Sequence, residues 1–379
     1  MPADRSPTET QRKPAWVRPS VEALPRHGTG SPSAADFAGP NAPKVHMLHL
    51  NESPYPPSPK AVEAVRSSAG SLNRYPDSQG KALAQALSAR TGVPAARILL
   101  GCGSDELIHD FCTFALSSGD HAVVPAPTFP SFAVEARIQG ATPLRVKLDA
   151  LGANDAAGLV AAVTERTRLV FCCTPNPPTG GQITAAGLEQ VAQGVPETVL
   201  LIVDEAYYEF GRQAGGPDAL AILAKRRGPW AVMRTFSKAY GLAGARLGYA
   251  LCGSDDVAEA LRKVKLHFGA TATAQAAALA ALEDDAYLDK VVATVARERQ
   301  RLSDGLAKLG LEVFPSAANF VSAKLPILAA AAVEQLRRRR ILIRDWRDPE
   351  HLHEIRITVG LAEDTDVVIA ALRDILAAA

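Results

Sequence analysis

The sequence predicts an α/β protein whose large domain holds a mostly parallel sheet and is joined to a smaller α+β domain. Short apolar runs alternate with amphipathic stretches from about residue 80 to about residue 235, as buried parallel strands alternate with their crossover helices. After about residue 270 a long helical stretch and separate strands replace this alternation. A length of 379 residues, 47% of them hydrophobic, also allows two domains.

The alternation begins where Lys81-Ala-Leu-Ala-Gln-Ala-Leu, with helical spacing, precedes Arg97-Ile-Leu-Leu-Gly, a short apolar run closed by glycine. The predicted order in this region is helix 81–87, strand 97–101, helix 105–116, strand 121–125, helix 155–163, strand 168–173, helix 184–193, strand 198–203, helix 217–225 and strand 230–235. Such an order predicts a sheet with helices on both faces.

The C-terminal region mixes helices and strands, which predicts a smaller domain packed beside the first. Its predicted elements are helix 285–309, strands 319–323, 341–344 and 354–359, and helix 364–376. The predicted division of the chain is a flexible arm (1–41), a first segment of the small domain with a substrate loop (42–72), a large domain (73–269) and the rest of the small domain (270–379).

Composition excludes several classes of function. A net charge of +1 leaves no surplus of positive charge for nucleic acid or an anionic membrane, and no run approaches the roughly 20 apolar residues of a membrane span. Five cysteines, two of them closing the apolar run 169–173, are expected to be reduced. We therefore expect a cytoplasmic protein. A mitochondrial-type presequence in residues 1–41 is an alternative that Asp4, Glu9 and Glu22 disfavour.

Four predicted strands end in polar sequences, at the edge of a parallel sheet where ligands bind. They are Gly101-Cys-Gly-Ser-Asp-Glu, Thr174-Pro-Asn-Pro-Pro-Thr-Gly, Asp204-Glu-Ala-Tyr-Tyr and Thr235-Phe-Ser-Lys-Ala-Tyr-Gly. Taken singly, such sequences are ordinary turns and helix caps. Their combination in this order is far more specific, and it predicts one site built from four strand ends.

Over roughly residues 45 to 376 this combination resembles fold-type I pyridoxal-phosphate (PLP) enzymes, specifically class I/II aminotransferases of the histidinol-phosphate aminotransferase type. The most specific element runs from Ser237-Lys238 to Arg246-Leu-Gly-Tyr. The resemblance implies the PLP-transferase fold of type I and PLP as the cofactor. It also implies that Lys238 binds the cofactor aldehyde covalently and that Arg246 binds its phosphate.

The residue chemistry agrees with these roles. A lysine that condenses with an aldehyde needs a pKa well below the usual value of about 10.4, and Lys238 lies beside the apolar Phe236 and Ala239. Its released amine is the natural base for moving the substrate Cα proton to the cofactor C4′ atom.

The cofactor phosphate needs N–H donors and positive charge. The turn Gly103-Ser104-Asp105 opens a predicted helix and offers backbone N–H groups at its positive end. The hydroxyl of Ser237 and the guanidinium of Arg246 add charge-assisted bonds, and Thr235 is expected to add a second hydroxyl.

By resemblance, Asp204 faces the pyridine nitrogen and keeps it protonated, so that the ring accepts electrons. Tyr207 bonds the phenolic oxygen, and Phe129 stacks on the ring. The family pattern is usually Pro-Asn-Asn-Pro-Thr-Gly, whereas Pro177 stands here in place of the second Asn, which contacts the phenolic oxygen. We expect that Tyr207 makes this contact alone, or that Asn176 reaches it through an altered loop.

Two arginines match family positions that bind acidic groups of the substrate. Arg356 is expected to bind its carboxylate or phosphate, for which a fork of donors is suited. Arg344 matches a second arginine used for substrate phosphate, and the alternative is that Asp345 and Asp348 are its structural partners. Tyr55 and Tyr75 match tyrosines that close over the substrate. Tyr75 reaches the other subunit's site in that family, so the resemblance implies a homodimer.

The resemblance implies that the amino donor is L-histidinol phosphate, in histidine biosynthesis, and that the 2-oxo acid acceptor is 2-oxoglutarate. Alternatives are an aminotransferase for aromatic or specialised-pathway amino acids and a threonine-phosphate decarboxylase-like enzyme. A PLP-binding regulator would carry a DNA-binding domain, for which the arm before residue 42 leaves no room. His351 and His353 have no third ligand in view, so no metal site is predicted.

Overall fold

The computed structural model describes residues 16–24, 32, 34–37, 43–346 and 348–378. Its larger sheet has seven strands in the order β2-β8-β7-β6-β5-β3-β4. The five strands from β4 to β7 in this order run parallel, whereas β8 is antiparallel to both neighbours. The strands are β2 (Ile98–Gly101), β3 (His121–Ala126), β4 (Thr142–Lys147), β5 (Thr167–Cys173), β6 (Leu200–Asp204), β7 (Trp230–Thr235) and β8 (Gly248–Cys252).

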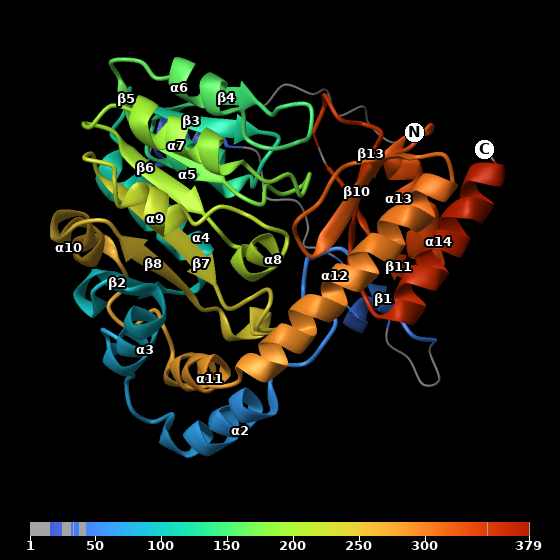
Figure 1. Ribbon diagram of the computed structural model, residues 1–379, viewed down its shortest axis with the longest axis horizontal. Coiled ribbons are helices and arrows are strands. Elements are labelled where there is room, and N and C mark those ends of the chain that lie inside the picture. Colours follow the sequence, from blue (N-terminus) through green and yellow to red (C-terminus); the bar gives the residue numbers. More distant parts are fainter. Residues whose placement is uncertain (1–15, 25–31, 33, 38–42, 347, 379) are drawn as a thin grey trace, which may run out of the picture.

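Both faces of this sheet are covered by helices, which is why its central strands are apolar throughout (Figure 1). In β5, Val170 and Cys172 belong to one core, and the alternate residues Leu169, Phe171 and Cys173 belong to the other. Helices α3 (Lys81–Thr91), α6 (Ala156–Ala161), α7 (Ala185–Gly194), α9 (Ala219–Leu223) and α11 (Ala272–Leu282) line the first core, and α4 (Gly103–Ala115), α5 (Ser131–Ile138) and α10 (Asp255–Val264) the second. The predicted α/β sheet is confirmed.

The C-terminal part forms a smaller antiparallel sheet in the order β12-β13-β10-β9. Its strands are β9 (Glu312–Val313), β10 (Phe320–Lys324), β12 (Arg344–Asp345) and β13 (Glu354–Thr358). Helices α12 (Asp285–Lys308), α13 (Ala329–Arg338) and α14 (Ala362–Ala377) share one apolar core with this sheet. Figure 1 shows α12 running obliquely from α11 to this smaller unit.

The predicted strand 341–344 is two short strands. β11 (Ile341–Leu342) pairs in parallel with β1 (His46–Met47), whereas β12 pairs with β13. The apolar pattern is continuous over these residues because Ile343 between the two strands is also buried. The pairing strand changes at Ile343 from β1 to β13, and the apolar pattern of the sequence does not show this change.

The N-terminal segment touches both parts of the molecule. β1 joins the smaller unit through β11, whereas α2 (Pro59–Ser68) packs against α11 beside the larger one. Of the predicted arm, α1 (Pro19–Glu22) contacts α5, and most of the remainder lies outside the described residues. The predicted domain boundaries therefore stay a prediction.

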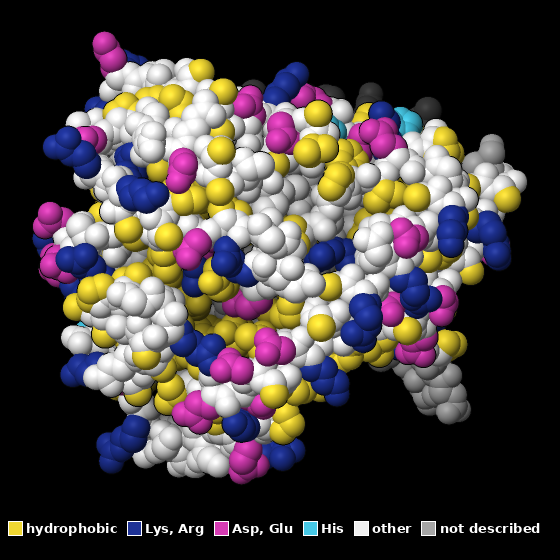
Figure 2. Space-filling view, viewed as in Figure 1, with side chains coloured by type: hydrophobic (Ala, Val, Ile, Leu, Met, Phe, Trp, Pro, Cys, Tyr) yellow, Lys and Arg dark blue, Asp and Glu magenta, His cyan; other side chains and the backbone are white. Residues whose placement is uncertain are grey.

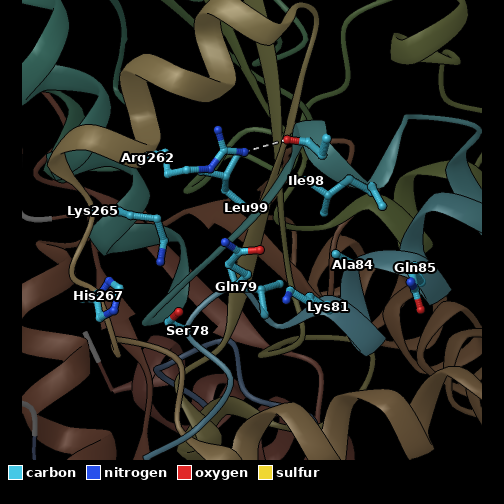
Figure 3. Close-up of a pocket in the computed structure, with 13 residues that line it drawn as sticks. Ser78, Gln79, Lys81, Ala84, Gln85, Ile98, Leu99, Arg262, Lys265 and His267 are labelled. Atoms are coloured by element: carbon cyan, nitrogen blue, oxygen red, sulfur yellow. Dashed lines mark hydrogen bonds between the residues drawn. The ribbon is translucent and has the colours of Figure 1, made fainter.

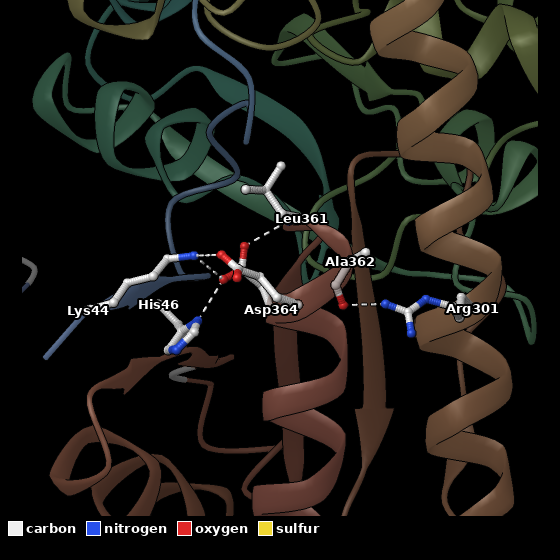
Figure 4. Close-up of polar contacts among 7 residues, drawn as sticks. Lys44, His46, Arg301, Leu361, Ala362 and Asp364 are labelled. Atoms are coloured by element: carbon white, nitrogen blue, oxygen red, sulfur yellow. Dashed lines mark hydrogen bonds and ion pairs between the residues drawn. The ribbon is translucent and has the colours of Figure 1, made fainter.

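A polar cluster fixes the segment that enters the smaller unit (Figure 4). His46 Nδ1 lies 2.6 Å from Asp364 Oδ1, and the other carboxylate oxygen of Asp364 accepts from the backbone N–H of Leu361. Burial opposes ionisation of Asp364, but these contacts and Lys44 lower its pKa. The carboxylate thus ties residues 44–46 to the start of α14.

Surface charge is mixed. On the face drawn in Figure 2, basic and acidic side chains are interspersed, in agreement with the net charge of +1. Among the described residues, every helix is too short or too polar to cross a bilayer. All five cysteines are free thiols, and four of them are buried.

Candidate active site

A cavity of about 310 Å³ opens where β5, β6 and β7 end. Nine of the sequence-predicted residues line it: Ser104, Asp105, Phe129, Asp204, Tyr207, Thr235, Ser237, Lys238 and Arg246. Its wall is completed by Leu50, Glu52, Cys173, Pro177, Ala206, Ala243 and Gly244. The parallel sheet therefore brings together side chains that are up to 142 positions apart in the sequence (104 to 246).

One end of the cavity is suited to an anion. The helix α4 begins there at Gly103, which has a φ of +78°. A Cβ atom at Gly103 would collide with the Arg246 guanidinium, so glycine permits the close approach of this arginine to the helix start. Thr235 Oγ1 and Ser237 Oγ lie 2.9 Å apart. Two hydroxyls, a guanidinium and the positive end of a helix converge here.

Lys238 lines the cavity three residues after the end of β7 at Thr235. Its Nζ donates to the backbone carbonyl of Leu50 at 3.3 Å. Burial, followed by the positive charges of Arg356 and Arg246, lowers its pKa to about 8. The neutral, nucleophilic form of this amine is therefore accessible near neutral pH.

Asp204, at the end of β6, is 3% exposed. Burial raises its pKa to about 7, although its Oδ1 accepts from the backbone N–H of Ala206 at 2.9 Å. That bond is the one side-chain hydrogen bond of Asp204 found among the described residues. A cationic N–H group in the cavity would return this carboxylate to its ionised form.

Tyr207 is buried, and its ring packs edge-on against Phe320 at 5.3 Å between centroids. Burial raises its pKa to about 12. Its hydroxyl oxygen accepts a hydrogen bond of 2.9 Å from Nδ2 of Asn51. Sequence reasoning did not select Asn51, although it lies in the segment Leu50-Asn-Glu-Ser-Pro-Tyr that contains Tyr55.

The structure does not bring Asn176 to the cavity. Its side chain is fully buried against the segment that follows β3, where Nδ2 donates to the carbonyl of Pro127 at 3.0 Å and Oδ1 accepts from the hydroxyl of Thr128 at 2.6 Å. The neighbouring Pro177 lines the cavity instead. The loop thus presents no amide from either position.

The two predicted substrate arginines lie opposite one another on antiparallel strands, Arg344 on β12 and Arg356 on β13. Directly opposed residues project from the same face of a sheet. Arg356 Nη2 donates to the carbonyl of His49 at 2.7 Å, but its buried Nε atom has no hydrogen-bond partner among the residues that the structure describes. Burial lowers the pKa of Arg356 to about 10, and the charge of Arg344 adds to this effect.

The two predicted tyrosines lie in different surroundings. Tyr55 is half-buried and packs against the apolar cluster that contains Tyr207. Tyr75 is 81% exposed and stacks on Phe268 at 4.5 Å between ring centroids. Neither tyrosine belongs to the cavity lining, and neither do Arg344 and Arg356.

A second cavity, of about 250 Å³, lies between α3, β2 and the end of α10 (Figure 3). Its polar wall includes Lys81, Arg262, Lys265 and His267, and Arg262 donates to the carbonyl of Ala96 at 2.8 Å. It holds none of the sequence-predicted residues and no carboxylate. The first cavity is therefore the candidate active site.

Comparison with known proteins decides the family. Residues 43–372 match the family model "Aminotransferase class I and II". The chain belongs to the class I and II aminotransferase family. It is 39% identical to an aromatic amino acid aminotransferase of Streptomyces avermitilis, over 93% of this chain and 95% of the relative. It is 35% identical to histidinol-phosphate aminotransferase 1 of Mesorhizobium japonicum, over 88% of this chain and 91% of the relative.

A solved structure agrees with this assignment. The crystal structure of histidinol-phosphate aminotransferase from Sinorhizobium meliloti in complex with PLP has a TM-score of 0.88 and 32% identity, and covers 97% of this chain and 99% of that one. This aminotransferase is a PLP-dependent enzyme. Its cavity fits that cofactor, with an anion cradle at one end and a buried, partly neutralised carboxylate beside the amine.

Proposed function

We propose that this aminotransferase moves the amino group of L-histidinol phosphate to 2-oxoglutarate, within histidine biosynthesis. The observation that carries the proposal is the pair Arg344 and Arg356, on one face of the smaller sheet. Two guanidiniums on one face of a sheet offer an anion positive charge and forked hydrogen-bond donors. A phosphate monoester or a second carboxylate is such an anion, and each of the two proposed substrates carries one of these groups.

The proposed catalytic residues are Lys238, Asp204 and Tyr207. When bound, PLP supplies an aldehyde that condenses with amines and a ring that takes up the electron pair of the broken Cα–H bond. Lys238 holds the aldehyde end and, once released, carries the proton between the substrate Cα and the cofactor C4′. Asp204 keeps a proton on the ring nitrogen, and Tyr207 donates to the phenolic oxygen.

The remaining cavity residues are proposed to position the cofactor. Ser104 and Asp105 at the start of α4, together with Ser237 and Arg246, surround the phosphate, while Gly103 and Thr235 shape that cradle. Phe129 covers one face of the ring. For Asn176 the hydrogen bonds favour a different role, since they hold the loop that carries Pro177 against the cavity.

We further propose a cytoplasmic homodimer. Tyr75 and Phe268 form an exposed aromatic pair, with Leu72 and Leu266 also exposed in the same two segments. Apolar side chains gathered in this way favour burial against a second copy of the chain. In that arrangement Tyr75 contributes to the site of the partner subunit, whereas Tyr55 closes over the substrate bound in the site of its own subunit.

Aromatic amino acids are the second candidate donors. Two relatives with this activity in their names, from Streptomyces avermitilis and Rhodococcus jostii, are each 39% identical to the chain. The apolar lining of Leu50, Phe129 and Ala206 also suits an aromatic side chain.

The test is the first half-reaction of the holoenzyme, measured as the decrease of its visible absorbance. The donors compared are L-histidinol phosphate, L-phenylalanine, L-tyrosine and O-phospho-L-threonine. We expect kcat/KM for L-histidinol phosphate to exceed that for the aromatic amino acids by about 100-fold, the value of one well-made phosphate contact of about 3 kcal/mol. Faster reaction of the aromatic amino acids would favour the second candidate. Release of CO2 from the phosphothreonine arm would indicate a decarboxylase.

A further inference from the structure

Asn51 is a buried polar residue with a left-handed backbone. It is 3% exposed and has a φ of +55°, a region that, apart from glycine, asparagine enters more readily than most residues. Such strained residues persist where the surrounding structure holds them, often at functional sites. Its backbone carbonyl accepts from Nδ2 of Asn319 at 3.0 Å, which keeps the segment in place.

The hydrogen bonds around Asn51 fix which way its amide points. Its backbone N–H donates to Thr358 Oγ1 at 2.9 Å, so that this hydroxyl oxygen is an acceptor. The one proton of the Thr358 hydroxyl is directed to Asn51 Oδ1 at 3.2 Å. The amide oxygen is thereby assigned, and Nδ2 faces the Tyr207 hydroxyl at 2.9 Å.

This order of donors determines what Tyr207 does. A phenol has one proton, and because its oxygen accepts from Asn51, that proton is left for an acceptor elsewhere. Tyr207 lines the cavity. We infer that Asn51 is a positioning residue that makes Tyr207 a hydrogen-bond donor toward the phenolic oxygen of the bound PLP. This inference rests on the proposed role of Tyr207.

The loop between β5 and α7 offers no side-chain donor of its own to the phenolic oxygen of PLP. Pro177 has no donor, and the amide of Asn176 is engaged with Pro127 and Thr128. Asn51 belongs to a different segment, which is attached to the smaller sheet through Thr358. Thr358 lies two positions beyond Arg356 on β13. The hydrogen bonds from Thr358 through Asn51 to Tyr207 therefore connect β13, the strand of Arg356, to the proposed cofactor site.

The experiment measures the pH midpoint of the visible absorbance change of the holoenzyme, without substrate. A hydrogen bond donated to the phenolic oxygen stabilises its negative form and keeps this midpoint low. Asn51→Asp preserves the shape of the side chain and its tolerance of positive φ, but its carboxylate accepts the Tyr207 proton. We expect the midpoint to rise by about one pH unit in Asn51→Asp, and by less in Asn51→Gly, a neutral variant that also tolerates positive φ.

Two further variants separate positioning from simple support. Asn319→Ala loosens the same segment without touching Tyr207, and it should lower the melting temperature while leaving the midpoint in place. Tyr207→Phe removes the donor itself and should raise the midpoint at least as much as Asn51→Gly. An unchanged midpoint in both Asn51 variants, or an equal rise in Asn319→Ala, overturns the inference.

The outcomes also distinguish this inference from the proposed function. If Tyr207→Phe raises the midpoint and the Asn51 variants do not, Asn51 has no positioning role, whereas the function of the site stands. If Tyr207→Phe leaves the midpoint unchanged, the role of Tyr207 fails and the inference fails with it. The donor panel then still tests the proposed function, because it depends on Lys238 and the arginines.

Discussion

The strand ends of the large sheet and the paired strands of the small sheet carry different charged groups. On the large sheet, Asp204 and Lys238 are held by buried backbone at the ends of neighbouring strands. On the small sheet, Arg344 and Arg356 are partly exposed and repel each other. The first arrangement places an amine and a carboxylate in one cavity, whereas the second offers an anion positive charge and forked donors.

This difference separates chemistry from specificity. Groups that act on the cofactor serve both half-reactions, so their loss should affect every substrate equally. Arg344 and Arg356 on the small sheet are proposed to contact the substrates, so their loss should affect one substrate more than another. The following variants test whether the two regions divide the work in this way.

The largest effect is expected from Lys238→Ala. Loss of both the covalent attachment and the proton carrier should remove the visible absorbance of the holoenzyme and reduce kcat by at least about 10⁴-fold in both half-reactions. Absorbance spectra and steady-state turnover measure these effects. Lys265→Ala, which removes a lysine from the second cavity, is the matched control and should keep both properties. Turnover retained by Lys238→Ala would refute the proposed mechanism.

Asp204→Asn should come next. An amide cannot hold a proton on the ring nitrogen as a carboxylate does, and loss of such a charged group typically reduces kcat by about 10²–10³-fold. Single-turnover rates of the two half-reactions should fall by the same factor. Asp218→Asn alters the cap of α9, where Asp218 accepts from the N–H of Ala221 at 3.1 Å, and should affect stability alone. A selective loss for one substrate would place Asp204 on the specificity side.

The cofactor region is also the region that the sequence predicts best. Its residues stand within a few positions of the ends of short buried strands. Once these strands are recognised in the sequence, the site residues can be located from them. Asn51 was missed because it reaches Tyr207 across 156 positions, and nothing in its own segment indicates that contact. Asn176 was expected near the cavity. The direction of its amide depends on acceptors that are distant in the sequence, such as the Pro127 carbonyl, and the sequence pattern does not show them.

The same limit applies to secondary structure. No strand was predicted at β4 (Thr142–Lys147), which lies at the sheet edge and has a single buried residue, so its apolar pattern is weak. α11 was missed because its sequence, ATAQAAALAAL, is apolar on nearly every side and has no helical period. The ends of the long amphipathic helix α12 were predicted to within one residue, because burial of one side of a helix gives its sequence a regular apolar spacing.

Arg344→Ala should separate the two substrates. Loss of one charge-assisted contact to phosphate should reduce kcat/KM for L-histidinol phosphate by about 10- to 100-fold, with a smaller effect on 2-oxoglutarate. The measurement is kcat/KM for each half-reaction. Arg337→Ala, on the exposed end of α13, controls for the loss of one positive charge. An equal loss for both substrates would remove the support for phosphate binding by Arg344.

The smallest effect concerns stability rather than rate. In the cofactor-free protein the pKa of Lys238 is lowered from 10.5 to about 8, so below pH 8 the folded state carries the full cost of a buried charge. Between about pH 8 and 10.5 the unfolded chain binds more protons than the folded one, and stability rises with pH. Lys238→Met, which removes this cost, should raise the melting temperature at pH 7 by a few degrees.

That advantage should shrink as the pH approaches 10.5, where the wild-type lysine is neutral in the folded state and increasingly neutral in the unfolded state. Melting curves of the cofactor-free proteins between pH 7 and 10 measure the difference, with Lys265→Met as the control for the loss of one lysine. A gap that widens with pH would mean that the amine at position 238 is not held in its neutral form by burial. The large-sheet region would then lack the preorganised nucleophile that distinguishes it from the small sheet.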